Sequence, residues 1–175
     1  MSSIPKVIKV TAIGIFLLLI SFLAHSQVKV ADAKVLNPVN ASMGINGSEI
    51  IAFAEKYLGT PYRYASSDPK KGFDCSGFVH YIFSHFNISL PRSSREYKTL
   101  GQTLKPEEFK VGDVIVFYGF RDKSHIGHVG IISEANGMKS KFIHASSGKA
   151  HSVIISDLDS EGYRSRFYRC ISRVP

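Results

Sequence analysis

One of the two cysteines, Cys75, has a sequence setting that suits nucleophilic chemistry. It opens a run of residues spaced as one face of an α-helix: Cys75, Phe78, Val79, Ile82, Phe83 and Phe86. Asp74 directly precedes it as a candidate N-cap, which places the thiol in the first turn. Unpaired backbone N–H groups and the positive end of the helix dipole stabilise a thiolate there and lower its pKa. A small core cysteine fits the same spacing, so periodicity alone leaves both roles open.

A thiol nucleophile needs a base, and the second half of the chain offers histidines. His128 and His144 each lie in a short segment rich in β-branched residues. If these segments form neighbouring strands, one imidazole can take the proton of the thiol, and the other can orient the first through its far nitrogen. His85 lies near the far end of the Cys75 helix, out of reach. His125 and His151 fall in predicted loops and are weaker candidates.

Two other roles compete for these side chains. Cys75, His128 and His144 could bind a metal, but the sequence has no Cys-x-x-Cys or His-x-x-x-His pair. We therefore predict neither a metal nor a cofactor. Cys75 could also pair with Cys170, as cysteines of exported proteins often do. A disulfide would remove the nucleophile.

Helices are predicted before strands. Ser48 is a good N-cap, apolar residues then recur at helical spacing to Leu58, and Gly59 can close the helix. The Cys75 helix follows a polar loop at residues 65–72 and can stop at Asn87. Within it, Gly77 is a poor helix former, which indicates that a second backbone or a substrate comes close. Residues 91–100 hold a short helix started by Ser93 or Ser94.

The second half of the chain has the residue composition of β-strands. Five segments are short and rich in β-branched or aromatic residues: 114–118, 128–132, 141–145, 152–155 and 166–171. Asn136-Gly137 separates two of them as a hairpin turn does. Helices followed by strands predict an α+β domain with an antiparallel sheet.

The N-terminal residues resemble a targeting segment. Lys6 and Lys9 precede an apolar run, and Ala24-His25-Ser26 is a small-x-small site. This is the pattern of a secretory signal peptide at residues 1–26, with an uncleaved anchor as the alternative. Residues 27–47 are interpreted as a linker and residues 48–175 as the domain. We expect a secreted, periplasmic or cell-envelope protein that meets the membrane only through this segment.

The net charge of +8 is spread over scattered lysines and arginines. No basic run interleaves with aromatic residues, so we predict no nucleic-acid partner. A basic surface is instead attracted to anionic polymers such as a cell wall. At 175 residues, the chain suits one domain with a sizeable core.

Seven segments, in order, are similar to those of a known family. They are Gly59-Thr60-Pro61-Tyr62-Arg63-Tyr64, Phe73-Asp74-Cys75-Ser76-Gly77-Phe78-Val79, Leu90-Pro91-Arg92-Ser93-Ser94, Val111-Gly112-Asp113-Val114, His128-Val129-Gly130-Ile131, Phe142-Ile143-His144-Ala145-Ser146 and Arg166-Phe167. With them the chain resembles the NlpC family of cell-wall cysteine peptidases, which have a circularly permuted papain-like fold. The resemblance implies N-terminal helices packed on a C-terminal antiparallel sheet of five to six strands.

The resemblance also implies the roles of individual residues. Cys75 is the nucleophile, His128 the base and His144 the group that orients His128. Tyr62 lines the site beside the thiol and helps to hold the oxyanion. Asp74 and Ser76 lie near the free amine end of the substrate.

The substrate expectation comes from the resemblance alone. It is a peptidoglycan stem peptide or cross-link, cut between a γ-D-glutamyl group and a diamino acid. A thiol amidase or acyltransferase on the same fold is an alternative, and a non-catalytic wall-binding module is another. The sequence departs from the family pattern at Ala65-Ser66-Ser67, at Tyr97 and in a longer loop at Gly119–Gly127.

Overall fold

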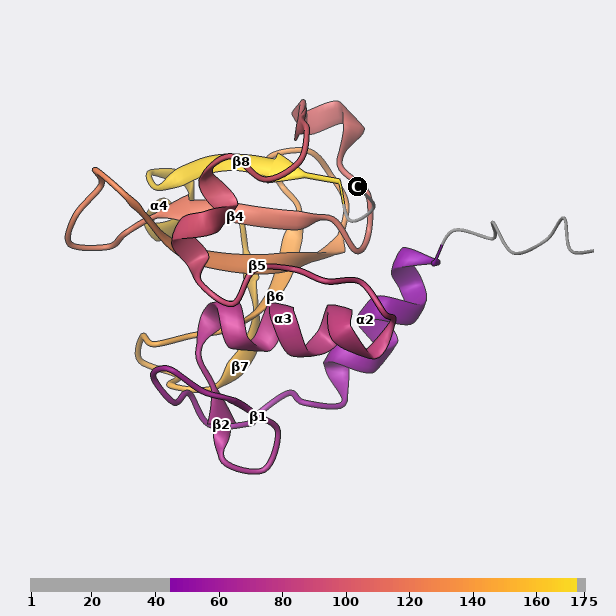
Figure 1. Cartoon of the computed structure of the whole chain (residues 1–175). Helices are drawn as coiled ribbons and strands as arrows, with labels where there is room; N and C mark the ends of the chain where they lie inside the picture. Colours follow the sequence, from indigo (N-terminus) through magenta and orange to yellow (C-terminus); the bar gives the residue numbers. More distant parts are fainter. Residues whose placement is uncertain (1–44, 173–175) are drawn as a thin grey trace, which may run out of the picture. The chain divides into compact units, whose positions relative to one another are not determined.

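The computed structural model describes residues 45–172, in which helices precede a sheet (Figure 1). The predicted signal peptide and residues 27–44 of the predicted linker lie outside the described residues. No helix of the described part is long and apolar enough to cross a membrane. The prediction of an α+β fold is confirmed, with α2 (Gly47–Glu55) and α3 (Cys75–His85) as the main helices.

Helix α2 begins earlier than predicted. Asn46 is the N-cap, and its side-chain oxygen accepts a hydrogen bond from the backbone N–H of Ser48 at 3.1 Å. The prediction of Ser48 as the cap is therefore wrong by two residues. Asparagine caps as well as serine, and Gly47 packs directly against Val111: a Cβ on Gly47 would lie 1.8 Å from the Val111 carbonyl oxygen. No sequence pattern reveals this contact, which only glycine allows at the first position of the helix.

Helix α3 follows the sequence prediction closely. Asp74 caps it, with its Oδ1 accepting from the N–H of Gly77 at 2.6 Å. The apolar stripe is buried from Cys75 to Phe83. A Cβ on Gly77 would lie 2.2 Å from the carbonyl oxygen of Ser66, so the glycine lets a second backbone pass. That backbone belongs to the polar loop, which forms a small hairpin of β1 (Ser67–Asp68) and β2 (Gly72–Phe73).

A six-stranded antiparallel sheet follows, in the order β3-β8-β4-β5-β6-β7. Its strands are β3 (Thr103–Leu104), β4 (Val114–Tyr118), β5 (Ile126–Glu134), β6 (Lys141–Ala145), β7 (Val153–Asp157) and β8 (Phe167–Ile171). Short helical turns connect them: η2 (Ser94–Lys98), η3 (Pro106–Glu108) and α4 (Glu161–Arg164). All five predicted strands are present, and β3 was missed because two residues carry no periodicity.

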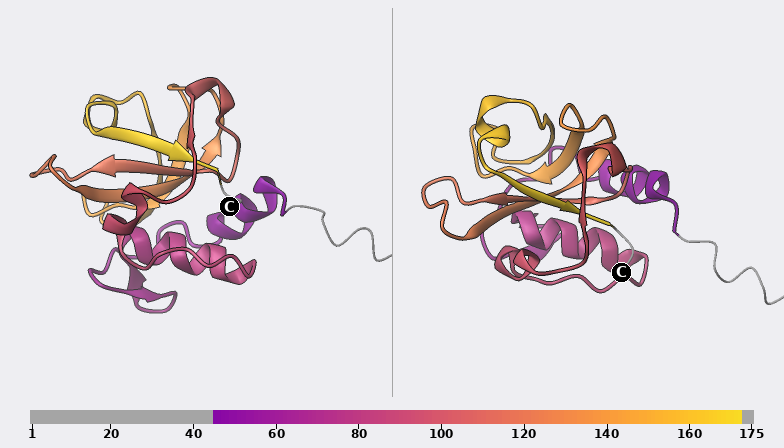
Figure 2. Two further views of the ribbon diagram at one scale, coloured as in Figure 1. Left: turned by 45° about the horizontal axis from the view of Figure 1, so that its top comes forward. Right: turned by 90° about the horizontal axis from the view of Figure 1, so that it is seen from above.

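The sheet has a separate apolar core on each face. Helices α2 and α3 pack on one face, against side chains such as Val129 and Ile143 (Figure 2, left). The opposite face carries a smaller cluster that includes Phe117, Phe142 and Leu158. Neighbouring residues of a strand point to opposite faces, so a side chain on this sheet belongs to one core or the other.

A bulge in β5 changes which face its side chains take. Phe117 pairs with His128, and Tyr118 pairs with Ile126, which leaves Gly127 without a partner. Ile126 faces the helices, whereas the His128 ring packs beside Phe117 on the other face, with centroids 5.8 Å apart. In a regular strand, residues two positions apart such as Ile126 and His128 share a face, and the bulge at Gly127 breaks this alternation.

Only glycine fits at the bulge. A Cβ on Gly127 would lie 2.5 Å from the Cα of Gly119 at the other end of the loop. The close approach of these two glycines closes the loop of residues 119–125 and aims His128 away from the helices.

Candidate active site

The thiol of Cys75 lies in the first turn of α3, against the start of β5. It donates a long hydrogen bond to the Gly127 carbonyl oxygen, with an Sγ–O distance of 4.0 Å. The backbone N–H of Val129 is close enough to the sulfur to lower the pKa of the thiol. Gly127 and Val129 are the neighbours of His128 in the chain. The packing of α3 on β5 therefore brings the sulfur to the backbone on both sides of the predicted base.

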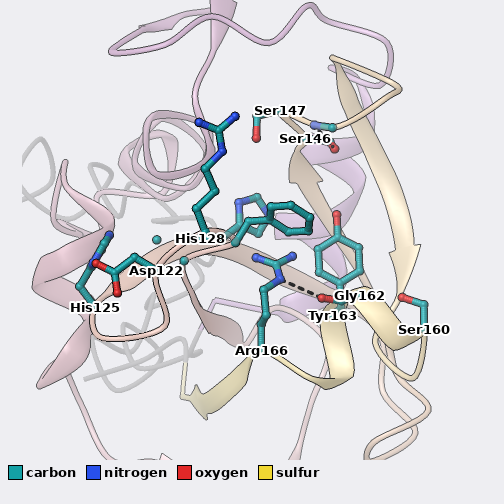
Figure 3. Close-up of a pocket in the computed structure, with 14 residues that line it drawn as sticks. Asp122, His125, His128, Ser146, Ser147, Ser160, Gly162, Tyr163 and Arg166 are labelled. Atoms are coloured by element: carbon teal, nitrogen blue, oxygen red, sulfur yellow. Dashed lines mark hydrogen bonds and ion pairs between the residues drawn. The ribbon is translucent and has the colours of Figure 1, made fainter.

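The Cys75 thiol and the His128 ring line two different cavities. The thiol cavity, of about 590 Å³, is lined by Tyr62, Tyr64, Ala65, Asp74, Cys75, Ser76, Arg92, Ser93, Ser94, Arg95, His125, Ile126 and Gly127. The histidine cavity, of about 800 Å³, contains His128 (Figure 3). His125 and Gly127 border both. Within residues 45–172 no hydrogen bond joins the sulfur to the His128 ring.

His128 begins a chain of polar side chains that crosses the sheet. Its Nε2 lies 2.9 Å from Nδ1 of His144 on β6. The Nε2 of His144 in turn lies 3.0 Å from the hydroxyl of Ser156 on β7 and 3.3 Å from that of Tyr163 on α4. The predicted pairing of the two imidazoles is therefore present. The Nδ1 of His128 is the ring nitrogen that remains for a proton from the thiol.

Gly130 makes room for the two imidazoles. It lies two residues after His128 on the same face of β5. A Cβ there would lie 2.7 Å from the Phe142 ring and 3.1 Å from the Cβ of His144. Any other residue would push the His144 side chain away from His128, so the glycine is part of the geometry of the pair.

The pKa of the Cys75 thiol is raised to about 11, mainly because the thiol is buried and secondly because Asp74 carries a negative charge. Hydrogen bonds from the backbone N–H groups of Val129, Ser76 and Cys75 act in the opposite direction. The expectation of a lowered thiol pKa is therefore wrong for this structure. The helix terminus supplies the expected donors, but burial outweighs them.

Both imidazoles are neutral in this environment. Burial is the main cause that lowers the pKa of His128 well below 6.5, and repulsion from a second protonated imidazole at His144 and from Arg166 adds to it. Burial also lowers the pKa of His144 to about 3, with a contribution from Arg166. At neutral pH the thiol is therefore protonated and both imidazoles are neutral, which are the charge states that general-base catalysis requires at the start.

Tyr62 lines the thiol cavity, as predicted. Burial raises the pKa of its hydroxyl to about 12, and the charges of Cys75 and Asp74 contribute. The hydroxyl therefore keeps its proton at neutral pH and can donate a hydrogen bond. His151 lies next to it, with ring centroids 5.3 Å apart, and not with the His128–His144 pair.

Asp74 and Ser76 line the thiol cavity, but the Asp74 carboxylate already has partners. Arg92 donates to it twice, from Nη1 to Oδ1 at 2.9 Å and from Nη2 to Oδ2 at 2.7 Å. Ser76 and the N–H of Gly77 donate to Oδ1 as well. The carboxylate thus caps α3 and forms a bidentate ion pair, so an amine would meet a charge that Arg92 already balances.

A match to a family model spans residues 59–172 and is described as the NlpC/P60 family. The chain belongs to the NlpC/P60 family. The match includes the segments from Gly59 to Ser94 and from Val111 onward. These segments carry the Cys75 thiol and both imidazoles.

Two curated relatives and one solved structure are similar to this NlpC/P60 chain. A gamma-DL-glutamyl hydrolase of Bacillus subtilis is 38% identical over 118 residues, which cover 67% of this chain but only 27% of the hydrolase. A probable endopeptidase NlpC homolog of Haemophilus influenzae is 36% identical over 138 residues, 77% of this chain and 67% of that protein. The crystal structure of an NlpC/P60 family protein from Bacillus cereus matches with a TM-score of 0.65 and 29% identity, over 74% of this chain and 40% of that one.

The other candidate histidines and the second cysteine of this NlpC/P60 domain have different surroundings. His85 stacks on Phe53, with ring centroids 3.8 Å apart, at the far end of α3. His125 borders both cavities, and its Nδ1 lies 2.9 Å from the Asp122 carboxylate. Both cysteines are free, and Cys170 is buried in the core on the sheet face opposite the helices. Within residues 45–172 no group of three or more histidine, cysteine or acidic side chains is placed to hold a metal ion.

Four residues near these cavities were missed by the sequence analysis. Arg92 and Arg166 lie in segments that resemble the family, so the motifs pointed to their positions without giving their roles. Ser156 and Tyr163 lie in no such segment. Their polar side chains reach His144 only because β7 and α4 fold back beside β6.

Proposed function

We propose that this protein is a cysteine endopeptidase that hydrolyses peptidoglycan stem peptides between a γ-D-glutamyl group and a diamino acid. The observation that carries the proposal is the Cys75 thiol at the start of α3, held against the two neighbours of His128. Two relatives from Bacillus subtilis support this choice of bond. One is named a gamma-DL-glutamyl hydrolase, and the other a bifunctional muramidase/DL-endopeptidase.

The first step moves the thiol proton to the base. In the tautomer that suits this step, Nε2–H of His128 donates to Nδ1 of His144, and Nε2–H of His144 donates to Ser156. This leaves a lone pair on Nδ1 of His128 for the proton. Catalytic hydrogen bonds commonly form or tighten only when substrate binds, and in the substrate-free structure the thiol donates instead to the Gly127 carbonyl oxygen at 4.0 Å.

Acyl transfer then proceeds in two stages. The thiolate attacks the γ-glutamyl carbonyl carbon, and the tetrahedral intermediate collapses to a thioester on Cys75. The imidazolium of His128 gives its proton to the departing amine of the diamino acid. Neutral His128 next takes a proton from water, which attacks the thioester and releases the γ-glutamyl product. The thiol is then protonated again.

Two groups can hold the oxyanion of the intermediate. The backbone N–H of Cys75 lies at the unpaired end of α3, and the Tyr62 hydroxyl lines the same cavity and stays protonated. We assign Asp74 and Ser76 to the amine end of the stem, with Arg92 holding the carboxylate in place. The bidentate pair fixes the orientation of the Asp74 carboxylate at the edge of the thiol cavity.

We further propose that residues 1–26 are a signal peptide and that the protein acts in the cell envelope. Lys6, Lys9 and the apolar run after them support the export signal. Relatives named as murein and NlpC endopeptidases support the location of the substrate.

The test is digestion of purified peptidoglycan by the protein and by its Cys75→Ala variant, with the fragments identified by mass. We expect new γ-D-glutamyl ends from the wild type and none from the variant. The variant should lose about 1–2 kcal/mol of stability and still melt cooperatively. Fragments from a folded Cys75→Ala protein would overturn the assignment. Products carrying an added amine would indicate an acyltransferase.

A further inference from the structure

Arg166 is a buried cation with no acidic partner. Only 9% of its surface is exposed. Its Nε donates to the Gly162 carbonyl oxygen at 2.8 Å, and its Nη1 donates to that of Tyr118 at 3.2 Å. Within residues 45–172 no aspartate or glutamate forms an ion pair with it. Charges removed from water to this degree are normally balanced by an opposite charge.

Aromatic rings surround the guanidinium group without neutralising it. Its carbon lies 5.2 Å from the ring centre of Tyr163, 5.5 Å from that of Phe120 and 5.9 Å from that of Phe117. Such contacts orient a guanidinium plane. Arginine carries five N–H donors, and the two backbone carbonyls leave Nη2 with no acceptor among the described residues.

The part of the Arg166 guanidinium group that donates to no backbone carbonyl faces the histidine cavity. Figure 3 shows its guanidinium group pointing inward toward His128, beside Tyr163. The rest of the lining favours an anion: it includes Arg121 and the hydroxyls of three serines, Ser146, Ser147 and Ser160. Asp122 is the one acidic residue of this lining, and it is paired with His125.

We propose that Arg166 binds a carboxylate of the leaving group, the diamino acid released when the γ-glutamyl bond is cut. This inference rests on the proposed function. The amine end and acyl part of the stem occupy the thiol cavity, so the leaving group extends past Gly127 into the histidine cavity, where His128 protonates its amine. A planar guanidinium fork matches a planar carboxylate.

Binding of the leaving group at Arg166 would also change the pKa of the neighbouring histidines. Arg166 helps to lower the pKa of both His128 and His144. A bound carboxylate offsets that charge and makes it easier for His128 to become an imidazolium when it takes the thiol proton. The site would then favour substrates whose diamino acid carboxylate is free over those in which it is amidated.

Two matched stem peptides test the proposal, one with a free carboxylate on the leaving diamino acid and one with a carboxamide. For Arg166→Gln we expect KM to rise roughly tenfold to hundredfold on the acid and to change little on the amide. Arg166→Lys should lie between, because it keeps the charge and loses the fork. Lys123→Gln is the charge-matched control: Lys123 is exposed, contacts Ser165 at 3.4 Å and does not line the cavity.

A purely structural Arg166 would give a different result. Its variants would lower the melting temperature and affect both peptides equally, which would overturn the proposal.

Binding is measured separately with the Cys75→Ala protein, titrated with L-lysine and with L-lysinamide and followed by NMR. We expect the acid to bind more tightly, and Arg166→Gln to abolish the difference. Equal binding of acid and amide would refute the carboxylate site. Acid-selective binding by a protein that cuts no stem peptide would refute the proposed function alone.

Discussion

The imidazoles of His128 and His144 meet at 2.9 Å, Nε2 to Nδ1, with their planes at 90° to each other. One ring comes from the strand that the Cys75 thiol touches, and the other from the next strand of the sheet. A neutral imidazole has one donor and one acceptor, so this bond couples the tautomers of the two rings: when Nε2–H of His128 donates to His144, His144 carries its own proton on Nε2 and donates it to Ser156. The bulge at Gly127 and the glycine at position 130 are what allow it.

Replacing the two histidines should have unequal effects. His128→Ala should reduce kcat/KM about as far as Cys75→Ala, because a thiol and its base act as a unit. His144→Ala should leave more activity, since it removes only the group that orients the base. Steady-state kinetics on a defined stem peptide measure both. His125→Ala, three residues from the base and paired with Asp122, is the control and should stay active. If it were the most damaging change, the base would be wrongly assigned.

The Cys75 thiol should react faster as the pH rises. A pKa of about 11 leaves it protonated at neutral pH, so the thiolate fraction grows roughly tenfold per pH unit and reaches no plateau near neutrality. Alkylation by iodoacetamide, located by mass spectrometry, measures the rate. A plateau in the alkylation rate below pH 7 would show that the helix terminus lowers the thiol pKa by more than burial raises it. Cys170 is fully buried, and burial raises its pKa too, so it should react only on unfolding.

Acid should destabilise the fold through the buried imidazoles. The pKa of His144 is about 3 in the folded protein and about 6.5 in the unfolded chain. As pH falls below about 6.5 the unfolded chain binds a proton that the folded one refuses, so the free energy of unfolding decreases toward pH 3. Urea unfolding at several pH values measures this slope. His144→Gln should make the dependence of the unfolding free energy on pH shallower. An unchanged slope would contradict a lowered pKa of His144 in the folded protein.

Asp74→Asn should separate the two roles of this carboxylate. Asparagine keeps the cap of α3 and loses the charge that pairs with Arg92, so it should lower the melting temperature less than Asp74→Ala, in which the lost cap alone costs roughly 1 kcal/mol. Loss of the charge should weaken activity mainly on stems with a free amine. It should also lower the pKa of the Cys75 thiol, because Asp74 raises that pKa. Equal activity of the Asn variant on free and blocked amines would refute the recognition role.

The sequence by itself determined the local elements and the identities of the reacting groups. The apolar stripe after Cys75 and the cap at Asp74 define α3, because a helix repeats every 3.6 residues and its first N–H groups need an acceptor. The β-branched runs define β4 to β8 to within two residues at each end. The order of the motifs was enough to indicate the family, which the match over residues 59–172 confirms.

Only the tertiary structure decided how these groups lie and what charge they carry. The bulge at Gly127 depends on the approach of Gly119, so the face taken by His128 could not be deduced from alternation along the strand. The pKa of Cys75 depends on how much water α3 and β5 exclude, which outweighs the local helix terminus. Arg166 is likewise a lone cation only because folding buries it without an acid. Burial and charge balance are sums over neighbours distant in sequence, and the chain order does not reveal them.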